Sequence, residues 1–141
     1  MPKVSIWGVI VRGYGAAAAN LEKQIPLIAR EFPEIAKCHR GSMNVWLNRG
    51  LRVDHPDYRI GPIDWGDPNP EEFGFHRVSI QFGPEGAVFR AWLYIPYNSP
   101  HYQNRSHIEV IAEKIHGIRY GLACQLNIPN GTWESEELLV I

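Results

Sequence analysis

The feature that most constrains the fold is a series of short strand-like segments separated by glycine and proline turns. Pairing of isolated short strands leaves open sheet edges, and closure of the sheet into a barrel removes them. The alternation of strands and helices that is typical of a parallel sheet is absent. The sequence therefore predicts a mainly β (α+β) fold, a small closed or nearly closed barrel of six or seven strands. The expected strands cover residues 4–11, 43–47, 75–82, 87–95, 106–112 and 122–128, with 138–141 as a seventh.

One helix of substantial length is expected between the first two strands. Its apolar residues recur at helical spacing, and they are Leu21, Ile25, Ile28 and Phe32. Asn20 is a plausible N-cap, and Pro33 is expected to end the helix near Phe32. Because proline lacks an amide donor and clashes with the preceding turn, we expect the regular helix to begin near Pro26.

Residues 48–74 differ from the rest of the chain, because they are rich in proline, glycine and acidic residues. We expect a long irregular segment there, and such segments in compact domains are usually binding loops or mobile flaps. Trp65 within it is either a plug of the core or a stacking surface. Further along, residues 75–95 are expected to form a β-hairpin. Asn130-Gly131 predicts a second tight turn.

Composition narrows the class of protein. The 141 residues suit one domain, which we take as residues 1–141. With 14 basic and 15 acidic side chains the net charge is −1, so nothing favours a nucleic acid or a membrane surface as partner. No apolar run is long enough to span a membrane. Cys38 and Cys124 are expected to be free, buried thiols in a reducing, cytoplasmic compartment, with a single disulfide as the alternative.

Ser42 and Asn44 are the first candidates for a functional site. They follow Gly41 in a tight turn that leads into a strand, and side chains two residues apart in extended chain point to the same side. A hydroxyl and an amide oxygen in that arrangement suit a hard cation or a phosphate. The alternative is that both side chains satisfy backbone groups of the turn.

Gly13 and Gly15 form a second candidate, since they lie between a strand and a helix. Glycine lets backbone amides approach a phosphate closely, and a helix N-terminus that follows attracts an anion. Arg12 and Tyr14 flank the first glycine, and Arg12 would hold a phosphate or else lie in solvent at the end of the strand. The spacing is that of neither a P-loop nor a dinucleotide-binding motif, so an ordinary turn is the alternative.

Glu109 is the third candidate. It lies between Ile108 and Val110, so its side chain is expected to point away from theirs, outward or into the mouth of a site. A carboxylate near a substrate hydroxyl can act as a general base, whereas a solvent-facing strand residue is the alternative. The six histidines show no spacing typical of a zinc site. Aromatic residues late in the chain line either a pocket for a flat ligand or the core, and they are Trp92, Tyr94, Tyr97 and Tyr102.

The order of these motifs resembles the archaeal CTP-dependent riboflavin kinase family, a cradle-loop barrel. The family usually shows Pro-Gly-Thr-Leu-Asn-Val-x-Leu where this chain has residues 40–47. It also has a glycine-rich loop after its opening strand and a Glu-Ile-Ile-Ala-Pro motif followed by Leu-Arg. The matching stretches here are Gly8-Val9-Ile10-Val11-Arg12-Gly13-Tyr14-Gly15, Arg40-Gly41-Ser42-Met43-Asn44-Val45-Trp46-Leu47, and Ile108-Glu109-Val110-Ile111-Ala112 with Ile118-Arg119.

The resemblance implies phosphoryl transfer from CTP to the 5′-hydroxyl of riboflavin, which gives FMN. It implies that residues 12–15 border the nucleotide phosphates and that Ser42 and Asn44 supply protein oxygens to Mg²⁺, which prefers hard oxygen ligands. It implies that Glu109 lies near the acceptor hydroxyl as base or orienting group. Positioning and charge neutralisation carry most of such a reaction, so a sparse set of residues suffices.

Several positions depart from the family pattern. Arg40 stands in place of proline, Ser42 in place of threonine and Glu113 in place of proline, while Tyr120-Gly121-Leu122 replaces the usual Asp-Gly-Asp. A second hypothesis is therefore a non-catalytic barrel that binds a flavin, a nucleotide or another small ligand. A third is a hydrolase or lyase that uses Glu109 with a histidine of residues 96–107. Small barrels with exposed aromatics often pair, so a homodimer is one expectation for the assembly.

Overall fold

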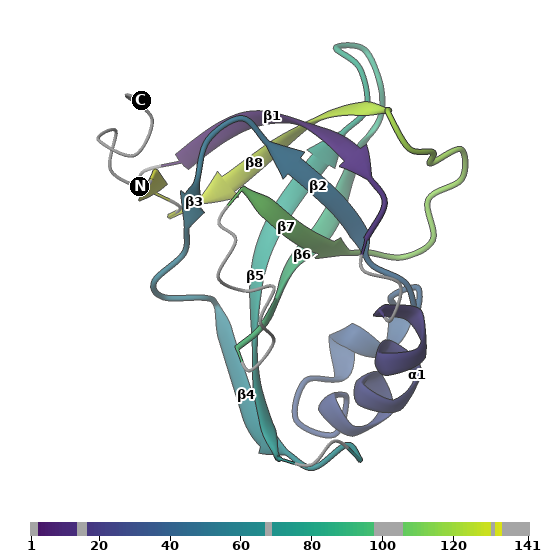
Figure 1. Cartoon of the computed structure of the whole chain (residues 1–141), viewed down its shortest axis with the longest axis vertical. Coiled ribbons are helices and arrows are strands. Elements are labelled where there is room, and N and C mark those ends of the chain that lie inside the picture. Colours follow the sequence, from purple (N-terminus) through teal and green to yellow (C-terminus); the bar gives the residue numbers. More distant parts are fainter. Residues whose placement is uncertain (1–2, 14–16, 67–68, 98–105, 131, 134–141) are drawn as a thin grey trace.

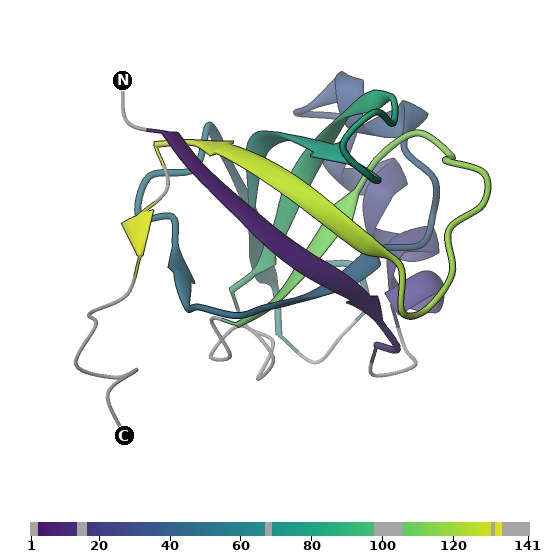
Figure 2. The same ribbon diagram turned by 90° about the horizontal axis from the view of Figure 1, so that it is seen from above.

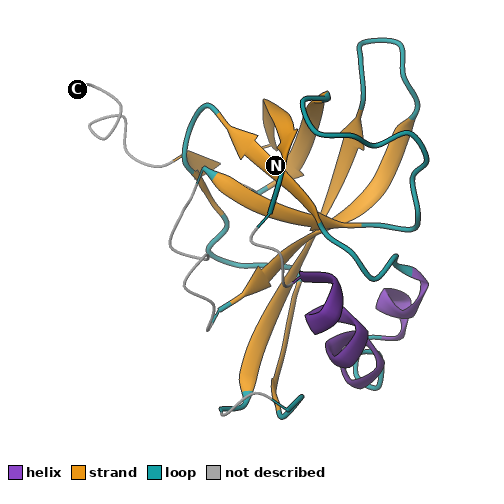
Figure 3. Ribbon diagram, turned by 45° about the vertical axis from the view of Figure 1, so that its right-hand side comes forward, coloured by secondary structure: helices purple, strands orange, loops and turns teal. Residues whose placement is uncertain are grey.

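The computed structural model describes residues 3–13, 17–66, 69–97, 106–130 and 132–133, and it is mainly β (Figures 1 and 3). Its elements follow the chain as β1 (Lys3–Val11), α1 (Ala17–Ile28), a 3₁₀ helix (Pro33–Lys37), β2 (Met43–Leu47), β3 (Leu51–Arg52), β4 (Tyr58–Ile63), β5 (Glu71–Gln81), β6 (Val88–Pro96), β7 (His107–Ile111), β8 (Ala123–Pro129) and β9 (Thr132–Trp133). No helix in the described ranges is both long and apolar enough to cross a membrane.

Six antiparallel strands close into a barrel, which confirms the predicted fold class. The strand order is β4-β5-β6-β7-β2-β1-β8, and a further pairing of β5 with β8 joins the two ends of the six-stranded part. β4 is an additional strand on the outer edge of β5. In Figure 2, β1 and β8 run side by side along the barrel wall, in agreement with their seven registered residue pairs.

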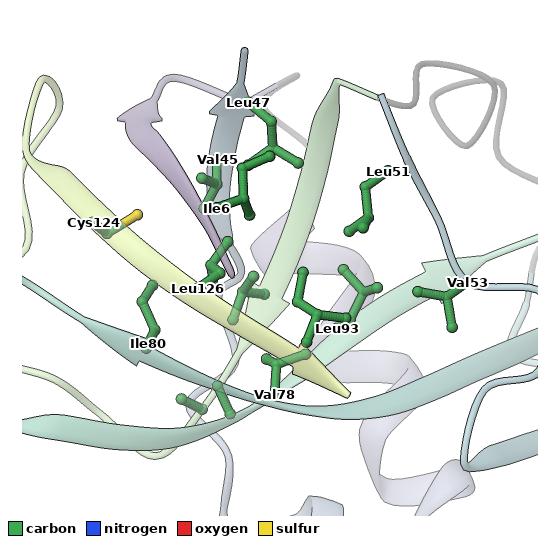
Figure 4. Close-up of a cluster of buried hydrophobic side chains, with 14 of the residues drawn as sticks. Ile6, Val45, Leu47, Leu51, Val53, Val78, Ile80, Leu93, Cys124 and Leu126 are labelled. Atoms are coloured by element: carbon green, nitrogen blue, oxygen red, sulfur yellow. The ribbon is translucent and has the colours of Figure 1, made fainter. Parts of the chain in front are cut away.

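The barrel interior is filled by one face of each strand. In β1, Ile6 and Ile10 are buried whereas Ser5, Trp7 and Val9 are exposed, as the two-residue period of a strand requires. The same alternation places the buried side chains of the other strands inside the barrel, and Figure 4 shows part of this cluster. They include Val45, Leu47, Val78, Ile80, Leu93, Val110, Cys124 and Leu126.

A second apolar cluster lies outside the barrel, where α1 covers the outer face of β5, β6 and β7 (Figure 1). Leu21, Ile25 and Ile28 of α1 are almost fully buried there. They share this cluster with strand residues that alternate with the barrel core, namely Phe73, Phe75, Trp92, Tyr94 and Ile111. The helix therefore covers only part of the outer surface, and the outer faces of β1 and β2 are left uncovered by it.

His76 lies inside the barrel rather than in a functional site. It is 0% exposed, and its Nε2–H donates to the carbonyl of Pro129 at the end of β8. Asp57, just before β4, places its Oδ2 3.6 Å from His76 Nδ1 and also accepts a hydrogen bond from the amide of Arg77 at 2.9 Å. These contacts tie the segment before β4 to β5 and β8.

Three expectations about the helix are wrong, namely its N-cap at Asn20, its start near Pro26 and its end near Phe32. α1 begins at Ala17, so Asn20 lies within it rather than capping it, and Pro26 is inside its last turn. The helix ends at Ile28, and the chain continues through a turn to the 3₁₀ helix at Pro33. Burial of Leu21 and Ile25 against the barrel stabilises the first turns, which explains why the helix tolerates a proline near its end.

The irregular segment predicted for residues 48–74 is also wrong in part, since it contains β3, β4 and the start of β5. β4 carries Gly61 and Pro62, which masked its strand pattern. It tolerates them because it is an edge strand with β5 as its partner, and its register shifts between Ile60 and Ile63. Trp65 packs against the outer cluster and donates through Nε1–H to Glu71 Oε1 at 3.2 Å, so it plugs this core.

The predicted turn at Asn130 does not return β9 onto β8. Asn130 has the positive φ of 59° that such turns require, yet β9 pairs with β3. The expected strand at 138–141 lies outside the described residues.

Both cysteines are free and buried, as predicted. Burial, which is the largest cause in each case, raises the pKa of Cys38 and of Cys124 to about 11 from an ordinary value of 9.0. Since the thiolate is the reactive form, we expect both thiols to resist Ellman's reagent in the folded protein at pH 8. Both should react at once in concentrated urea. Fast reaction of either thiol under native conditions would contradict this.

Candidate functional site

The strand register brings the separate sequence motifs together on the outer face of the barrel. Asn44 of β2 is paired with Val11 of β1 on one side and with Glu109 of β7 on the other. Glu109 is paired in turn with Tyr94 of β6. Directly opposed residues have Cβ atoms about 4.5–5.5 Å apart, so Val11, Asn44, Glu109 and Tyr94 form a row across four strands.

Ser42 and Glu109 are in direct contact. The Ser42 hydroxyl donates a hydrogen bond of 2.8 Å to Glu109 Oε1. Glu109 lies on the face opposite to the barrel core, since Val110 is buried inside and Ile108 packs against that core. The expectation that Glu109 points away from its two neighbours is confirmed. The structure thus joins the first and third of the candidates, Ser42 and Glu109, into one polar group.

Asn44 is held from two sides. His107 donates through Nε2–H to Asn44 Oδ1 at 3.0 Å. On the side of β1, the backbone of Gly13 lies so close that a Cβ there would be 2.7 Å from Asn44 Cγ. Glycine at position 13 is therefore needed for the approach of the first loop to Asn44. Asn44 is 8% exposed, so its amide is almost fully buried between His107 and Gly13.

Tyr94 links the site to the helix. Its hydroxyl donates a hydrogen bond of 2.6 Å to Oε1 of Gln24, a buried residue of α1. Burial, and then the negative charges of Glu109 and Glu71, raise the pKa of Tyr94 well above its ordinary value of 10.0, and the bond with Gln24 acts in the opposite direction. Tyr94 therefore remains a neutral phenol beside the carboxylate of Glu109.

A cavity of about 350 Å³ opens beside Ser42. It is bounded on one side by the turn before β2 and on the other by the segment that follows β7. Its lining includes His39, Ser42, Met43, Glu113, Lys114 and His116. This volume is at the lower end of the range for small-molecule sites. The cavity and the polar group of Ser42 and Glu109 share one residue, so they form a continuous site.

Two arginines, Arg12 and Arg40, belong to the segments that carry the candidate residues, and their side chains make different contacts. The Arg12 guanidinium lies over the ring of Tyr120, 5.4 Å from its centroid. Arg40, two residues before Ser42, has a buried Nη1 with no hydrogen-bond partner in the described part of the chain. Tyr14 and Gly15 lie outside the described residues, so the predicted phosphate-binding loop is described at Arg12 and Gly13 alone.

Sequence reasoning missed two residues of this site, Gln24 and Lys114, and it considered His107 only as one of the two histidines of residues 96–107. His107, Gln24 and Lys114 each contact or border it. His107 had a usable signal, because it shares the face of Glu109 two residues earlier in the same strand. Gln24 and Lys114 had none, since their places depend on how α1 and the segment after β7 pack.

Three side chains of the site carry oxygens of the hard kind that Mg²⁺ prefers. Ser42 Oγ, Asn44 Oδ1 and Glu109 Oε1 are all hard oxygens, which this ion prefers, and Mg²⁺ usually keeps several waters as further ligands. The described residues contain no group of three or more His, Cys, Asp and Glu side chains that could hold a metal ion. A site with one carboxylate and two neutral oxygens does not need such a group.

Comparison with models of known protein families and with curated proteins finds no match to this chain.

The bond between Tyr94 and Gln24 should contribute measurably to stability. Tyr94→Phe leaves the Gln24 oxygen buried without a donor, so we expect the free energy of unfolding in urea to fall by about 1–3 kcal/mol. Tyr58→Phe is the matched control, because Tyr58 is partly exposed and stacks on Phe32 through its ring alone. That variant should stay within about 0.5 kcal/mol of the wild type. Equal losses in both variants would contradict the role of the hydrogen bond.

The close approach of Gly13 to Asn44 gives a second prediction. Gly13→Ala places a methyl group against Asn44, so we expect destabilisation by about 1–3 kcal/mol through overpacking. Gly41→Ala is the control, since a Cβ there meets the exposed ring of His39 at 3.3 Å. Urea unfolding of both variants measures the difference. A Gly13→Ala protein as stable as the control would show that the loop at residue 13 moves away from Asn44 without loss of stability.

Proposed function

We propose that the protein is a phosphotransferase similar to the CTP-dependent riboflavin kinases. It would transfer a phosphate from a nucleoside triphosphate to riboflavin or another small alcohol. The observation that carries this proposal is the convergence of Gly13, Ser42, Asn44 and Glu109, which lie far apart in the sequence.

The cavity beside Ser42 suits the nucleotide. Lys114 in its lining offers a positive charge to phosphate oxygens. Arg40 lies in sequence between His39 and Gly41, which line the cavity, and its buried Nη1 has no hydrogen-bond partner among the described residues. An unsatisfied buried donor is costly unless a ligand engages it. The departure from the family at Arg40 thus adds a charge that favours an anionic ligand.

Mg²⁺ would be held by Ser42 and Asn44, with Glu109 close by. When bound, it would neutralise charge on the phosphates. In the structure as it stands, Ser42 donates to Glu109 and Asn44 accepts from His107. These bonds hold the Ser42 and Asn44 oxygens in place within the folded barrel, so the protein itself orients the proposed metal ligands.

In this proposal Glu109 acts on the acceptor hydroxyl. Its Oε1 already accepts a hydrogen bond from one alcohol, that of Ser42, at 2.8 Å, which is the reach that a general base requires. In the transfer, a bond forms between the acceptor oxygen and the terminal phosphorus, and the bond to the bridging oxygen of the nucleoside diphosphate breaks. Glu109 takes the proton from the hydroxyl, and Tyr94 beside it remains neutral.

The alternative is a barrel that binds the same ligands without turnover. The hydrogen bonds of Ser42 with Glu109 and of Asn44 with His107 favour it, because the polar groups of the site already satisfy one another. A base whose oxygen is engaged by Ser42 must exchange that partner for the substrate. Measurement of turnover separates the two hypotheses.

The direct test incubates the purified protein with riboflavin, Mg²⁺ and each nucleoside triphosphate in turn, and measures FMN by chromatography. We expect FMN with CTP. Asn44→Ala should lower the rate at least about 100-fold, by analogy with the loss of one charge-stabilising contact in other enzymes, and the variant should remain folded. Asn127→Ala is the matched control, since Asn127 accepts a similar bond from Ser5 on the barrel surface far from the site.

Equal activity of Asn44→Ala and the wild type would remove Asn44 from the mechanism. Binding of nucleotide or riboflavin in calorimetry without any FMN would support the binding barrel instead. Consumption of a substrate that persists in excess chelator, without formation of FMN, would point to the hydrolase or lyase hypothesis with Glu109.

A further inference from the structure

Trp46 is a large aromatic residue that the barrel leaves exposed close to the site. Its side chain is 49% exposed, although aromatic side chains of this size are usually well buried. It lies two residues after Asn44 in β2, and therefore on the same outer face of the strand. The rise of a strand puts the Cα atoms of these two residues about 7 Å apart.

The neighbours of Trp46 extend this surface and connect it to the site. Val9 of β1 is paired with Trp46 on one side and is exposed, and His107 of β7 is paired with it on the other. The Trp46 and His107 rings meet edge to face, with centroids 6.3 Å apart and planes at 69°. We call Val9, Trp46 and His107 the aromatic shelf. His107 also donates to Asn44 Oδ1, so the shelf is continuous with the polar group.

The shelf differs in chemistry from the other end of the site. It contributes an indole, an imidazole and an apolar side chain, whereas the cavity beside Ser42 is lined by the charged side chains of Lys114 and Glu113. A strongly charged ligand therefore belongs at the Ser42 end, and a flat ring at the shelf. Stacking of a conjugated ring on an exposed aromatic side chain is tolerant of ring identity and contributes substantially to binding.

We propose that the aromatic shelf seats the planar, conjugated ring of the acceptor alcohol, stacked on Trp46. The hydroxyl-bearing chain of the acceptor then runs along the outer face of β2 toward Glu109, and the phosphate donor approaches from the opposite end through the cavity. His107 acts as a positioning residue, because it contacts both the ring of Trp46 and the amide of Asn44. This inference rests on the proposed function and adds to it the side from which the acceptor enters and the residue that selects it.

The test measures binding without turnover, using riboflavin as the ring-bearing probe and ribitol, its hydroxylated chain without the ring. Riboflavin binding is followed through its fluorescence and by calorimetry, and ribitol binding by calorimetry. The variants are Trp46→Ala, Trp46→Phe and Trp7→Ala. Trp7 is the matched control, since it is also 49% exposed and lies on the outer face of the neighbouring strand β1.

We expect Trp46→Ala to weaken riboflavin binding by roughly 5- to 150-fold, the range observed when a stacking side chain is removed. Trp46→Phe should retain most of the affinity, and Trp7→Ala should bind like the wild type. Ribitol should bind the wild type and Trp46→Ala equally weakly. In turnover, the KM for riboflavin should rise in Trp46→Ala while that for the nucleotide stays unchanged.

Other outcomes overturn the inference. Absence of riboflavin binding, unchanged binding by Trp46→Ala, or an equal loss in Trp7→Ala would each do so. A shift from dimer to monomer in Trp46→Ala, measured by analytical ultracentrifugation, would assign the shelf to a second copy of the chain. Formation of FMN with unchanged KM in Trp46→Ala would refute the shelf and leave the proposed function standing. Riboflavin binding that depends on Trp46, without any formation of FMN, would refute the kinase function and support the role of the shelf in binding.

Discussion

The pairing of β5 with β8 is the contact on which the rest of the structure depends. β5 is the longest strand of the molecule as described, with eleven residues, and it pairs with β4, β6 and β8. Its inward residues join the barrel core, while Phe73 and Phe75 on its outer face join the cluster beneath α1. Without the three registered pairs to β8, the sheet would keep two open edges. β1, β2 and β7 are neighbours through their own direct pairing, and closure fixes the barrel that they share with β5, β6 and β8.

Register then determines which side chains meet at the site. A slip of one residue between β2 and β7 would turn Asn44 or Glu109 into the barrel. Burial of Val45 and Val110 opposes such a slip, because both are completely buried in the core. The polar row is therefore specified by apolar residues that alternate with it. The chemistry on the outer face depends on packing on the inner face.

The parts of the fold that the sequence predicted are those with an uninterrupted two-residue period. β2 was predicted with its observed bounds, and β1, β7 and β8 within one residue or so at each end. Prediction failed where packing in the folded protein overrode a preference of the local sequence. Pro26 pointed to a late helix start, yet apolar packing of Leu21 and Ile25 extends the helix to Ala17. Gly61 and Pro62 obscured β4, whose edge position permits them.

The candidate site shows the same division. Asn44 and Glu109 were identifiable because they interrupt apolar strands with hydrogen-bonding groups, and Ser42 because it follows Gly41 in the turn before a strand. The contact of Ser42 with Glu109 could not be inferred, since it arises from the register of β2 with β7. Gln24 was missed because it is polar without a motif, and its role follows from its bond with Tyr94. His107 was not distinguished from His101, because its contact with Asn44 is created by the fold. The cavity near Lys114 depends on the course of a segment with no regular structure.

The position of β8 also has a consequence for biosynthesis. β1 borders β8 along seven residue pairs, and β8 begins at Ala123, 112 residues after β1 ends at Val11. At a synthesis rate of about 5–20 residues per second, the first strand waits roughly 6–20 s before its neighbour leaves the ribosome. During that interval its hydrogen-bonding edge is open, and strand edges of this kind attract other chains. The nascent barrel is thus most exposed to aggregation through the strand that carries Trp7 and Val9, and chaperone protection would matter most there.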